Sequence, residues 1–483
     1  MDEILSRYCP RIEFESYEDF YANYRCNVPE DFNFAYDVVD EWARIQPDKP
    51  ALLWTNDEGE LRSYTFADMK RLSGKAANAL ADLGVARGDV VMLILKQRPE
   101  VWVLMCALMK IGAVCIPGTY QLTPKDIEYR CNIAEVKVLV AVDDGDLIAG
   151  IREARPRCGG VKQYALAGRF AGGAPVPEGF VDLCAMIEGA GERYARPSGV
   201  PATRTTDPML IYFSSGTTGM PKMVLHNHSL PLGHIVTAKY WQCVQEDRVH
   251  LTQTDSGWAK FAWGKIYGQW ICGAAVGAYD TEKFSPQGLL AALGRLRPAT
   301  FCAPATIFRF LIKEDLSSFD FSFIEHTSVA GEPLSPEVFY QIKEKTGLEI
   351  REGLGQSETS VLAAAFKWLP VKPGSMGKPA PLFGLRLLDE NGAECDEGIV
   401  GNISVTAAGE PGTLAADRLR GGSAESGAEG GTEDGVKSGA GGTALGGSTG
   451  TSKIPGLFRG YWKDDGITRD CWRDGVYYTG DMA

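Results

Sequence analysis

The feature that most constrains the fold of this chain is a regular alternation of short apolar runs with single amphipathic segments. Between residues 90 and 142, three such runs, Val90–Leu95, Ala113–Pro117 and Val136–Val142, are separated from one another by one segment of helical periodicity each. The alternation resumes after residue 206, with helices predicted to begin at Pro286 and Pro336. Strands joined by single helices form right-handed βαβ crossovers. The sequence therefore predicts an α/β fold with mostly parallel sheets and helices packed against them.

Local signals mark where several of these helices begin and end. Thr65 with Asp68 three residues later is typical of a capping box, and apolar residues at helical spacing follow until Gly84. Pro99 is predicted to begin another helix, which Gly112 ends because glycine readily adopts the left-handed conformation.

The stretch Tyr212–Leu225, which reads YFSSGTTGMPKMVL, combines an apolar run with a loop rich in glycine and hydroxyl groups. Gly216 and Gly219 permit backbone angles that let several N–H groups point into one concavity. The hydroxyl side chains add donors, and Lys222 adds a positive charge. The loop is not a Walker A sequence, because no GxxxxGK[ST] string occurs. It predicts a cradle for a polyphosphate, and a solvated Gly/Ser/Thr connector is the alternative.

Each polar motif of the chain directly follows a predicted strand. In open α/β sheets ligands bind beyond the carboxyl ends of the strands, so we expect motifs that are distant in sequence to share one cleft. The strand and motif pairs are Met209–Phe213 before the phosphate loop, Val249–Gln253 before Ser256–Trp258, Thr327–Val329 before Ala330–Pro333, and Leu348–Arg351 before Glu352–Glu358.

Composition restricts the partners of the chain. The 483 residues carry 62 acidic and 49 basic side chains, a formal net charge of −13, with no basic run, which argues against binding nucleic acid. No apolar stretch approaches the roughly 20 residues of a membrane span, and the N-terminus lacks the features of a signal peptide. Twelve cysteines without a CxxC pair predict reduced, mostly buried thiols in a reducing compartment. We expect the cytoplasm, with the mitochondrial matrix as the open alternative, and the oligomeric state stays open.

The chain is predicted to divide into four regions. Residues 1–32 form a lead-in with a helix on the main body, and residues 33–407 form a large domain. Residues 408–452 consist mainly of Gly, Ala, Ser, Thr and Glu, and are predicted to be a disordered insertion because they bury too little apolar surface to offset ordering entropy. Residues 453–483 complete the large domain.

Five motifs in a fixed order are similar to those of the adenylate-forming superfamily, which contains the acyl-CoA synthetases, luciferases and peptide-synthetase adenylation domains. They are SSGTTGMPK at 214–222, AGEP at 330–333, EGLGQSE at 352–358, GLFRGYW at 456–462 and YYTGD at 477–481. The resemblance implies the large N-terminal domain of that fold, with a smaller β-rich subdomain. It also implies a small C-terminal domain after Asp481, with a lysine that assists adenylation; this chain ends at Ala483. We therefore expect slow adenylation by the chain alone.

The resemblance assigns roles to individual residues. Lys222, Ser357 and Glu358 are implied as catalytic residues, with Glu358 as the Mg²⁺ ligand and Ser357 at a position where the family usually has threonine. Leu354 stands where the family usually has the tyrosine that lies against adenine, so stacking on the base is lost. Asp481 is implied to accept hydrogen bonds from the ribose hydroxyls. The complete set implied to bind ATP is Ser214, Ser215, Gly216, Thr217, Thr218, Gly219, Met220, Pro221, Lys222, Gly331, Glu332, Pro333, Glu352, Gly353, Leu354, Gly355, Gln356, Ser357 and Asp481.

The segment Asp255–Gly264 resembles that of medium-chain acyl-CoA synthetases and is implied to line the acyl pocket. We assign substrate binding to Trp258 and Lys260, whereas Phe261 and Trp263 are equally well explained as core residues. Asp255, the one acid here, precedes the segment expected to line the pocket, which disfavours amino-acid substrates. His226 and His228 are interpreted as helix-start or substrate-edge residues and not as metal ligands.

Together these features predict an acid–thiol ligase, an acyl-CoA synthetase of the medium-chain type, that uses ATP, Mg²⁺ and CoA. It would join a medium-chain or aromatic carboxylic acid to AMP and then to CoA. Two alternatives stay open: a nucleotide-binding pseudo-enzyme or truncated module, and an amino-acid adenylation domain.

Overall fold

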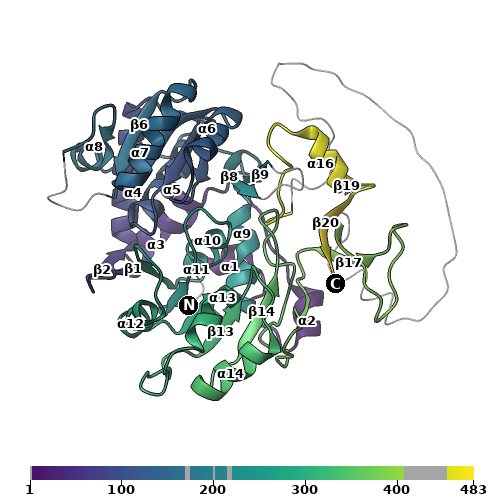
Figure 1. Cartoon of the computed structure of the whole chain (residues 1–483). Coiled ribbons are helices and arrows are strands. Elements are labelled where there is room, and N and C mark those ends of the chain that lie inside the picture. The colour runs from purple at the N-terminus through teal and green to yellow at the C-terminus, as the bar shows by residue number, and fades with distance from the viewer. Residues whose placement is uncertain (1–2, 169–174, 200–201, 215–219, 407–453) are drawn as a thin grey trace, which may run out of the picture.

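The computed structural model describes residues 3–168, 175–199, 202–214, 220–406 and 454–483. Within these residues two large sheets, predominantly parallel, carry most of the helices, and a small antiparallel sheet lies beside them (Figure 1). The predicted insertion at 408–452 lies outside the described residues.

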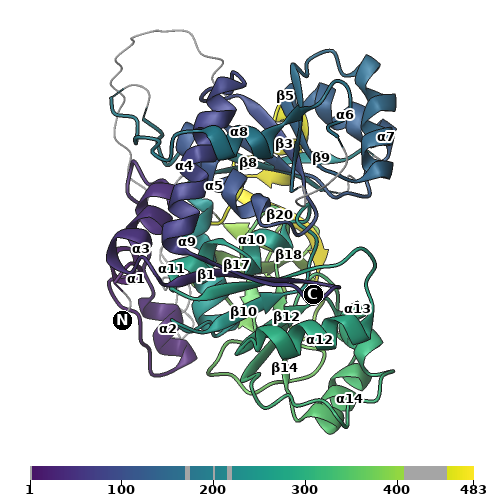
Figure 2. The ribbon, with the colours of Figure 1, turned by 90° about the vertical axis from the view of Figure 1, so that its left-hand side faces the viewer.

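The first sheet contains seven described strands and is parallel except at one edge. Helices α4, α5 and α8 cover one of its faces and α6 and α7 the other (Figure 2). Its last strand, β9, runs antiparallel to β8, so the phosphate loop connects the two strands of a hairpin. In order across the sheet the strands are β7 (Val181–Asp182), β6 (Gln163–Ala167), β5 (Val136–Val142), β3 (Val90–Ile94), β4 (Val114–Pro117), β8 (Pro208–Ser214) and β9 (Lys222–Asn227).

The second sheet has nine described strands, and its six central strands are parallel. Antiparallel strands lie at both edges. In order they are β16 (Lys378–Pro379), β15 (Ala363–Ala364), β14 (Ile350–Leu354), β13 (His326–Val329), β12 (Thr300–Ala303), β10 (Val249–Thr252), β11 (Ala275–Asp280), β1 (Pro50–Asn56) and β2 (Leu61–Thr65).

The third sheet has four described antiparallel strands and corresponds to the β-rich subdomain that the resemblance implies. It contains β17 (Gly384–Leu388), β18 (Asn402–Thr406), β20 (Val476–Met482) and β19 (Trp472–Arg473), and α16 (Asp465–Cys471) precedes β19. This sheet and α16 lie at the right of Figure 1.

The helices follow the predicted boundaries closely. Thr65 and Asp68 form the predicted capping box at the start of α4, and Gly112 ends α5 in the left-handed conformation. The longer helices are α4 (Phe66–Asp82), α5 (Glu100–Ile111), α6 (Pro124–Ile133), α7 (Gly145–Ala154), α12 (Pro286–Leu296) and α14 (Pro336–Thr346). The shorter ones are α3 (Asp40–Ile45) after η1 (Ala35–Val39), η2 (Arg155–Arg157), α8 (Leu183–Gly189), α9 (Leu230–Ile235) continued by η3 (Val236–Trp241), α10 (Lys260–Gly264), α11 (Tyr267–Ile271) and α13 (Ala305–Leu311).

The lead-in differs from its prediction, because it contains two short helices, α1 (Leu5–Tyr8) and α2 (Tyr17–Asn23), where one was expected. It does pack on the main body: the ring of Phe20 lies 4.5 Å from that of Tyr240 and 4.9 Å from that of Trp368, between centroids. These aromatic contacts bury Phe20 completely.

Buried tryptophans link the two large sheets into one core. The indole N–H of Trp54 in β1 donates to the carbonyl of Gln97, which follows β3, at 2.9 Å. Trp102 in α5 donates to the carbonyl of Lys265, between α10 and α11. These hydrogen bonds connect segments of the first sheet's layer with segments of the second.

Two further predictions can be compared with the structure. All twelve cysteines lie in described residues and none forms a disulfide, and seven of them are buried, as predicted. Among the described helices, none combines the length and the apolar character of a transmembrane segment.

Candidate active site

The hairpin β8–β9 places the two ends of the phosphate loop side by side, since Ser214 and Lys222 are paired across its strands. Lys222 is thus the first residue of β9 and not a loop residue. Met220 is exposed, and the carbonyl of Pro221 accepts a hydrogen bond from Tyr129 at 3.1 Å. Ser215, Gly216, Thr217, Thr218 and Gly219 lie outside the described residues.

Glu358 lies at the centre of a polar cluster at the base of this hairpin. Its Oε1 accepts a hydrogen bond from the hydroxyl of Tyr461 at 2.9 Å and from that of Ser214 at 3.5 Å. The ammonium of Lys222 lies 5.2 Å from the centroid of the Tyr461 ring. Burial raises the pKa of Glu358, while Tyr461 and Lys222 favour its charged form. The structure therefore brings together Ser214, Lys222 and Glu358, as the sequence predicts, and adds Tyr461.

Segment 456–462, the GLFRGYW motif, joins the hairpin to the loop that carries Glu358. The amide of Phe458 donates to the carbonyl of Glu358 at 2.8 Å, and the amide of Arg459 donates to the carbonyl of Leu225 in β9 at 2.7 Å. Sequence reasoning named this motif but gave Tyr461 no role. The signal was present, because Tyr461 is a hydroxyl-bearing residue within one of the ordered motifs.

A second polar group connects Gln356 with the end of β20. The Nε2 of Gln356 donates to Oδ2 of Asp481 at 2.7 Å, and its Oε1 accepts from the hydroxyl of Tyr477 at 2.8 Å. Asp481 itself is exposed. Gln356 and Glu358 belong to one short loop. This loop therefore contacts Asp481 through Gln356 and the Lys222 hairpin through Glu358.

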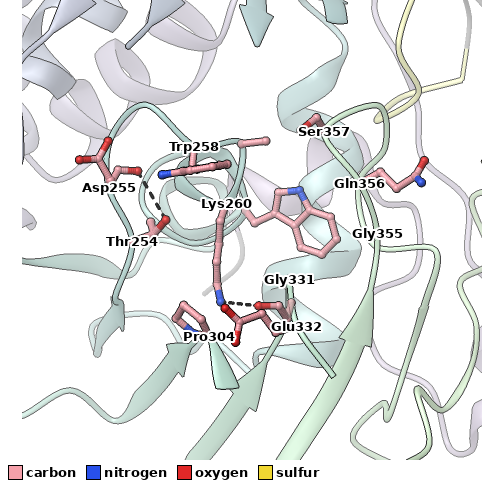
Figure 3. A pocket seen from close by; sticks show the side chains of 13 residues that line it. Thr254, Asp255, Trp258, Lys260, Pro304, Gly331, Glu332, Gly355, Gln356 and Ser357 are labelled. Atoms are coloured by element: carbon pink, nitrogen blue, oxygen red, sulfur yellow. Dashed lines mark hydrogen bonds between the residues drawn. The ribbon is translucent and has the colours of Figure 1, made fainter. Parts of the chain in front are cut away.

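A cavity of about 560 Å³ opens next to the same loop (Figure 3). Both predicted substrate-binding residues line it: Trp258 is 61% exposed, and Lys260 donates from Nζ to the carbonyl of Ala330 at 2.7 Å. Trp263, which was left open between core and pocket, is nearly buried but also contributes to the lining. The lining residues are Thr254, Asp255, Trp258, Ala259, Lys260, Trp263, Pro304, Ala330, Gly331, Glu332, Gly355, Gln356 and Ser357.

The position of Asp255 corrects an expectation, because this acid belongs to the cavity lining and does not merely precede it. Its Oδ1 accepts the amide N–H of Gly257 at 2.7 Å, and burial raises the pKa of Asp255 to about 6. The buried Lys265 opposes that rise. The argument against amino-acid substrates from its position therefore no longer holds.

Among the residues that the resemblance assigns to ATP, those at 331–333 and 352–357 divide into residues that line the cavity and residues that do not. Gly331, Glu332, Gly355, Gln356 and Ser357 line the cavity, whereas Pro333, Glu352, Gly353 and Leu354 do not. The strand β14 extends to Leu354, so Glu352 and Gly353 are strand residues. The carboxylate of Glu352 accepts the amides of Leu334 at 3.3 Å and Gly374 at 3.1 Å, which holds two loops together. Leu354 lines a separate cavity of about 860 Å³ beside the small sheet.

His226 contacts the backbone of the loop that carries Ser357. Its Nε2 lies 2.7 Å from the carbonyl oxygen of Ser357, and burial lowers the pKa of His226 to about 4, so the neutral ring donates from Nε2. His226 lies within β9 and not at a helix start, whereas His228 directly precedes Ser229, the N-cap residue of α9. Among the described residues, no group of three or more His, Cys, Asp or Glu side chains is arranged to hold a metal ion.

Comparison with known proteins agrees with this geometry. The sequence matches the family described as AMP-binding enzyme over residues 39–409. The chain belongs to the AMP-binding enzyme family. Acyl-coenzyme A synthetase ACSM3, mitochondrial, of Mus musculus is 36% identical over 399 residues, which are 81% of this chain and 67% of that protein. The human ACSM4 synthetase, also mitochondrial by name, is 35% identical over 396 residues, or 80% of this chain and 66% of the relative. The chain thus spans about two thirds of the length of the curated relatives that it matches.

Solved structures show that the fold is shared by this family. An acyl-CoA synthetase of Brucella canis superposes with a TM-score of 0.79 at 22% identity, covering 97% of this chain and 77% of that chain. An anthranilate CoA ligase, AuaEII, solved in complex with anthranoyl-AMP, gives a TM-score of 0.76 at 20% identity, with 94% and 75% coverage. The predicted family, fold class and assignment to the AMP-forming acid–thiol ligases are confirmed.

Proposed function

We propose that this AMP-binding enzyme activates a medium-chain or aromatic carboxylic acid with ATP and transfers the acyl group to CoA. In the first step, a carboxylate oxygen of the acid attacks the α-phosphorus of ATP, and pyrophosphate leaves as the acyl-adenylate forms. In the second, the CoA sulfur attacks the acyl carbon, the thiol proton is lost and AMP leaves. One observation carries the proposal. Residues 355–357 line a largely apolar cavity, and Glu358, the next residue of the same loop, lies at the centre of the polar cluster.

Positioning and charge neutralisation dominate phosphoryl-type transfers. Lys222 would offset charge on the leaving pyrophosphate, and Ser214 begins the loop that would hold the phosphates. Ser357, whose carbonyl is fixed by His226, would present its hydroxyl to the α-phosphate. Asp481, held by Gln356, would accept hydrogen bonds from the ribose.

The residues around Glu358 fit a magnesium ion. Mg²⁺ prefers hard oxygen ligands and takes one or two carboxylates together with phosphate oxygens and water. Here the buried carboxylate of Glu358 and the hydroxyl of Ser214 supply oxygens. A bound Mg²⁺ would neutralise phosphate charge.

The cysteines bear on the compartment in which the enzyme would work, and the net charge bears on its partners. All twelve cysteines are outside disulfides, which suits a reducing compartment such as the cytoplasm or the mitochondrial matrix. The net charge of −13 disfavours nucleic acid as a partner.

The test combines nucleotide binding with detection of the intermediate. Calorimetry with Mg·ATP, followed by mass spectrometry of single turnovers with octanoate or benzoate, should show ATP binding and an acyl-adenylate even where turnover is slow. Glu358→Gln and Lys222→Met should each reduce adenylate formation about 10²-fold or more. Lys343→Met, which removes an exposed ion pair with Glu349, is the matched control and should have no effect.

The outcomes separate the alternatives. ATP binding without an adenylate from any acid would favour a nucleotide-binding module. Adenylates formed only with amino acids would favour an amino-acid adenylation domain, for which Asp255 is the candidate partner of the substrate ammonium.

A further inference from the structure

The side chain of Lys260 begins at the first residue of α10 and runs along the wall of the cavity to the cavity floor. Figure 3 shows it extending from the α10 turn toward Gly331 and Glu332, with its ammonium hydrogen-bonded to the carbonyl of Ala330. An ammonium group has three N–H donors, and the structure describes one hydrogen bond for it. The cavity around it is lined largely by apolar groups, including Trp258, Ala259 and Pro304.

The neighbouring carboxylate offsets only part of the positive charge at this floor. Glu332 is close enough to interact with Lys260, but its Oε2 already accepts hydrogen bonds from Arg309 at 3.0 Å and from the hydroxyl of Thr306 at 2.6 Å. Lys260 and Arg309 thus provide two positive charges against one negative charge. The other acid of the lining is Asp255, and the positive charge of Lys265 favours its charged form.

Lys260 is half-buried, and a cation that is partly removed from water is costly unless an anion accompanies it. Burial lowers the pKa of Lys260, which means that the surroundings disfavour its charged form. A methyl-terminated acyl tail would leave the ammonium beside apolar atoms, whereas a carboxylate at the tail end would supply both charge and acceptors.

We propose that Lys260 selects acids with a second carboxylate at the far end of the chain, so that the enzyme activates one carboxyl group of a dicarboxylic acid while the other pairs with Lys260. The inference rests on the proposed function, since it requires an acyl-adenylate in this cavity. Ser357 and Gln356 lie on the opposite wall from the Lys260 ammonium, which leaves room for a tail between the two ends (Figure 3). Adenine is the rival occupant near Ala330, but its ring nitrogens are neutral acceptors and do not balance the charge.

The test uses stable acyl-adenylate mimics on the whole chain, so that it does not depend on turnover. Calorimetry compares 5′-O-sulfamoyladenosine carrying a hexanoyl group with the same compound carrying a 5-carboxypentanoyl group. The carboxylated compound should bind about tenfold more tightly or better, as expected for a desolvated charge pair. Lys260→Met should abolish this preference while leaving the hexanoyl compound bound equally well or more tightly.

A second variant tests the charge balance without touching the cavity. Arg309→Gln releases the Glu332 carboxylate to neutralise Lys260 and should weaken the carboxylated compound alone, by about threefold to tenfold. Lys313→Met, near the end of the same helix, is the matched control and should change neither compound.

The results that would overturn the inference are distinct. Equal binding of both compounds, unaffected by Lys260→Met, would overturn the role of Lys260 and leave the proposed function standing. Equal weakening of both compounds by Lys260→Met, shared by AMP, would show that Lys260 serves the nucleotide. Failure of the carboxylated compound alone to bind would overturn this inference only, whereas failure of both compounds to bind would overturn the proposed function as well.

Discussion

At the scale of single residues, the site depends on one buried carboxylate whose charge is maintained by its neighbours. Glu358 is only 7% exposed, and burial favours its protonated form. The hydroxyl of Tyr461 opposes that tendency by donating a hydrogen bond to the carboxylate. Under the proposed function Glu358 would bind Mg²⁺, and a metal ligand must be deprotonated, so Tyr461 would be a positioning residue for nucleotide binding.

The substitution Tyr461→Phe should raise the pKa of Glu358, because it removes a donor to the charged form. Binding of Mg·ATP should weaken at acid pH, and the midpoint of its loss should move upward by about 0.5–1 pH unit. Calorimetry between pH 5 and 8 measures this midpoint. Tyr340→Phe, which changes an exposed tyrosine of α14, is the control. An unchanged midpoint in Tyr461→Phe would contradict the role given to the hydroxyl.

At the same scale, sequence could identify the residue types but not their contacts. Lys222, Glu358 and Asp481 stand in ordered motifs, so they could be named in advance. Tyr461 could not be given a role, because its partnership with Glu358 spans 103 residues and arises only where segment 456–462 crosses between β9 and loop 355–358.

At the scale of elements, local signals were sufficient for the limits of α4 and α5 and insufficient for the end of strand β14. Capping boxes and helix-ending glycines fix helix limits through short-range hydrogen bonds, so α4 and α5 begin and end close to the predicted residues. The strand predicted at Leu348–Arg351 was expected to end before Glu352, whereas β14 continues to Leu354. Gly353 in this strand lies against Trp241, and Gly355 directly after it lies against Trp263, where no larger residue fits.

This close packing predicts the effect of Gly355→Ala. An added Cβ would come within 2.0 Å of the Trp263 ring and 2.8 Å of the Ser360 carbonyl oxygen, so Trp263 must move into the cavity. The free energy of unfolding should fall by about 1–3 kcal/mol, and affinity for an acyl-sulfamoyladenosine should fall more than affinity for AMP. Gly145→Ala is the matched control, since nothing lies within 4 Å of its added Cβ. Equal losses for both ligands would show that the alanine disturbs the nucleotide and not the acyl side.

At the scale of the whole molecule, the parallel βαβ organisation was predictable and the division into two large sheets was not. Apolar runs give strand positions but not strand order, so the sequence predicted one shared cleft but not the number of sheets that form it. The phosphate loop belongs to the first sheet, Ala330–Pro333 and Glu352–Glu358 belong to the second, and Tyr477–Asp481 lies in β20 of the third.

The whole molecule should also lose stability in mild acid. All five histidines are described; four are buried and His326 is half-buried, and burial lowers their pKa values to about 3 or 4; they are His226, His228, His234, His250 and His326. Between pH 6.5 and 4 the unfolded chain binds protons that the folded chain does not, so stability falls as pH falls through this window. At pH 5 each histidine costs about 2 kcal/mol. Buried acids with raised pKa values, such as Asp255 at about 6, act in the opposite direction and reduce the net slope.

The substitution His228→Leu isolates the contribution of one histidine to this pH dependence. Neither ring nitrogen of His228 has a hydrogen-bond partner among the described residues, so His228→Leu removes a titrating group without breaking a polar contact. Urea unfolding should show a stability gain over the wild type that is about 2 kcal/mol larger at pH 5 than at pH 7.5. Parallel stability curves for the two proteins across this range would contradict the assignment.

The central claim is that the phosphate-loop hairpin, loop 355–358 and the end of β20 join a carboxylate to AMP, and oxygen-18 transfer tests it most directly. With octanoate labelled in both carboxylate oxygens, Mg·ATP and hydroxylamine as the acyl acceptor, the nitrogen of hydroxylamine attacks the acyl carbon and AMP leaves with the bridging oxygen. The account predicts one labelled oxygen in each AMP released and none in pyrophosphate. Unlabelled AMP, or label found in ADP or phosphate, would contradict it.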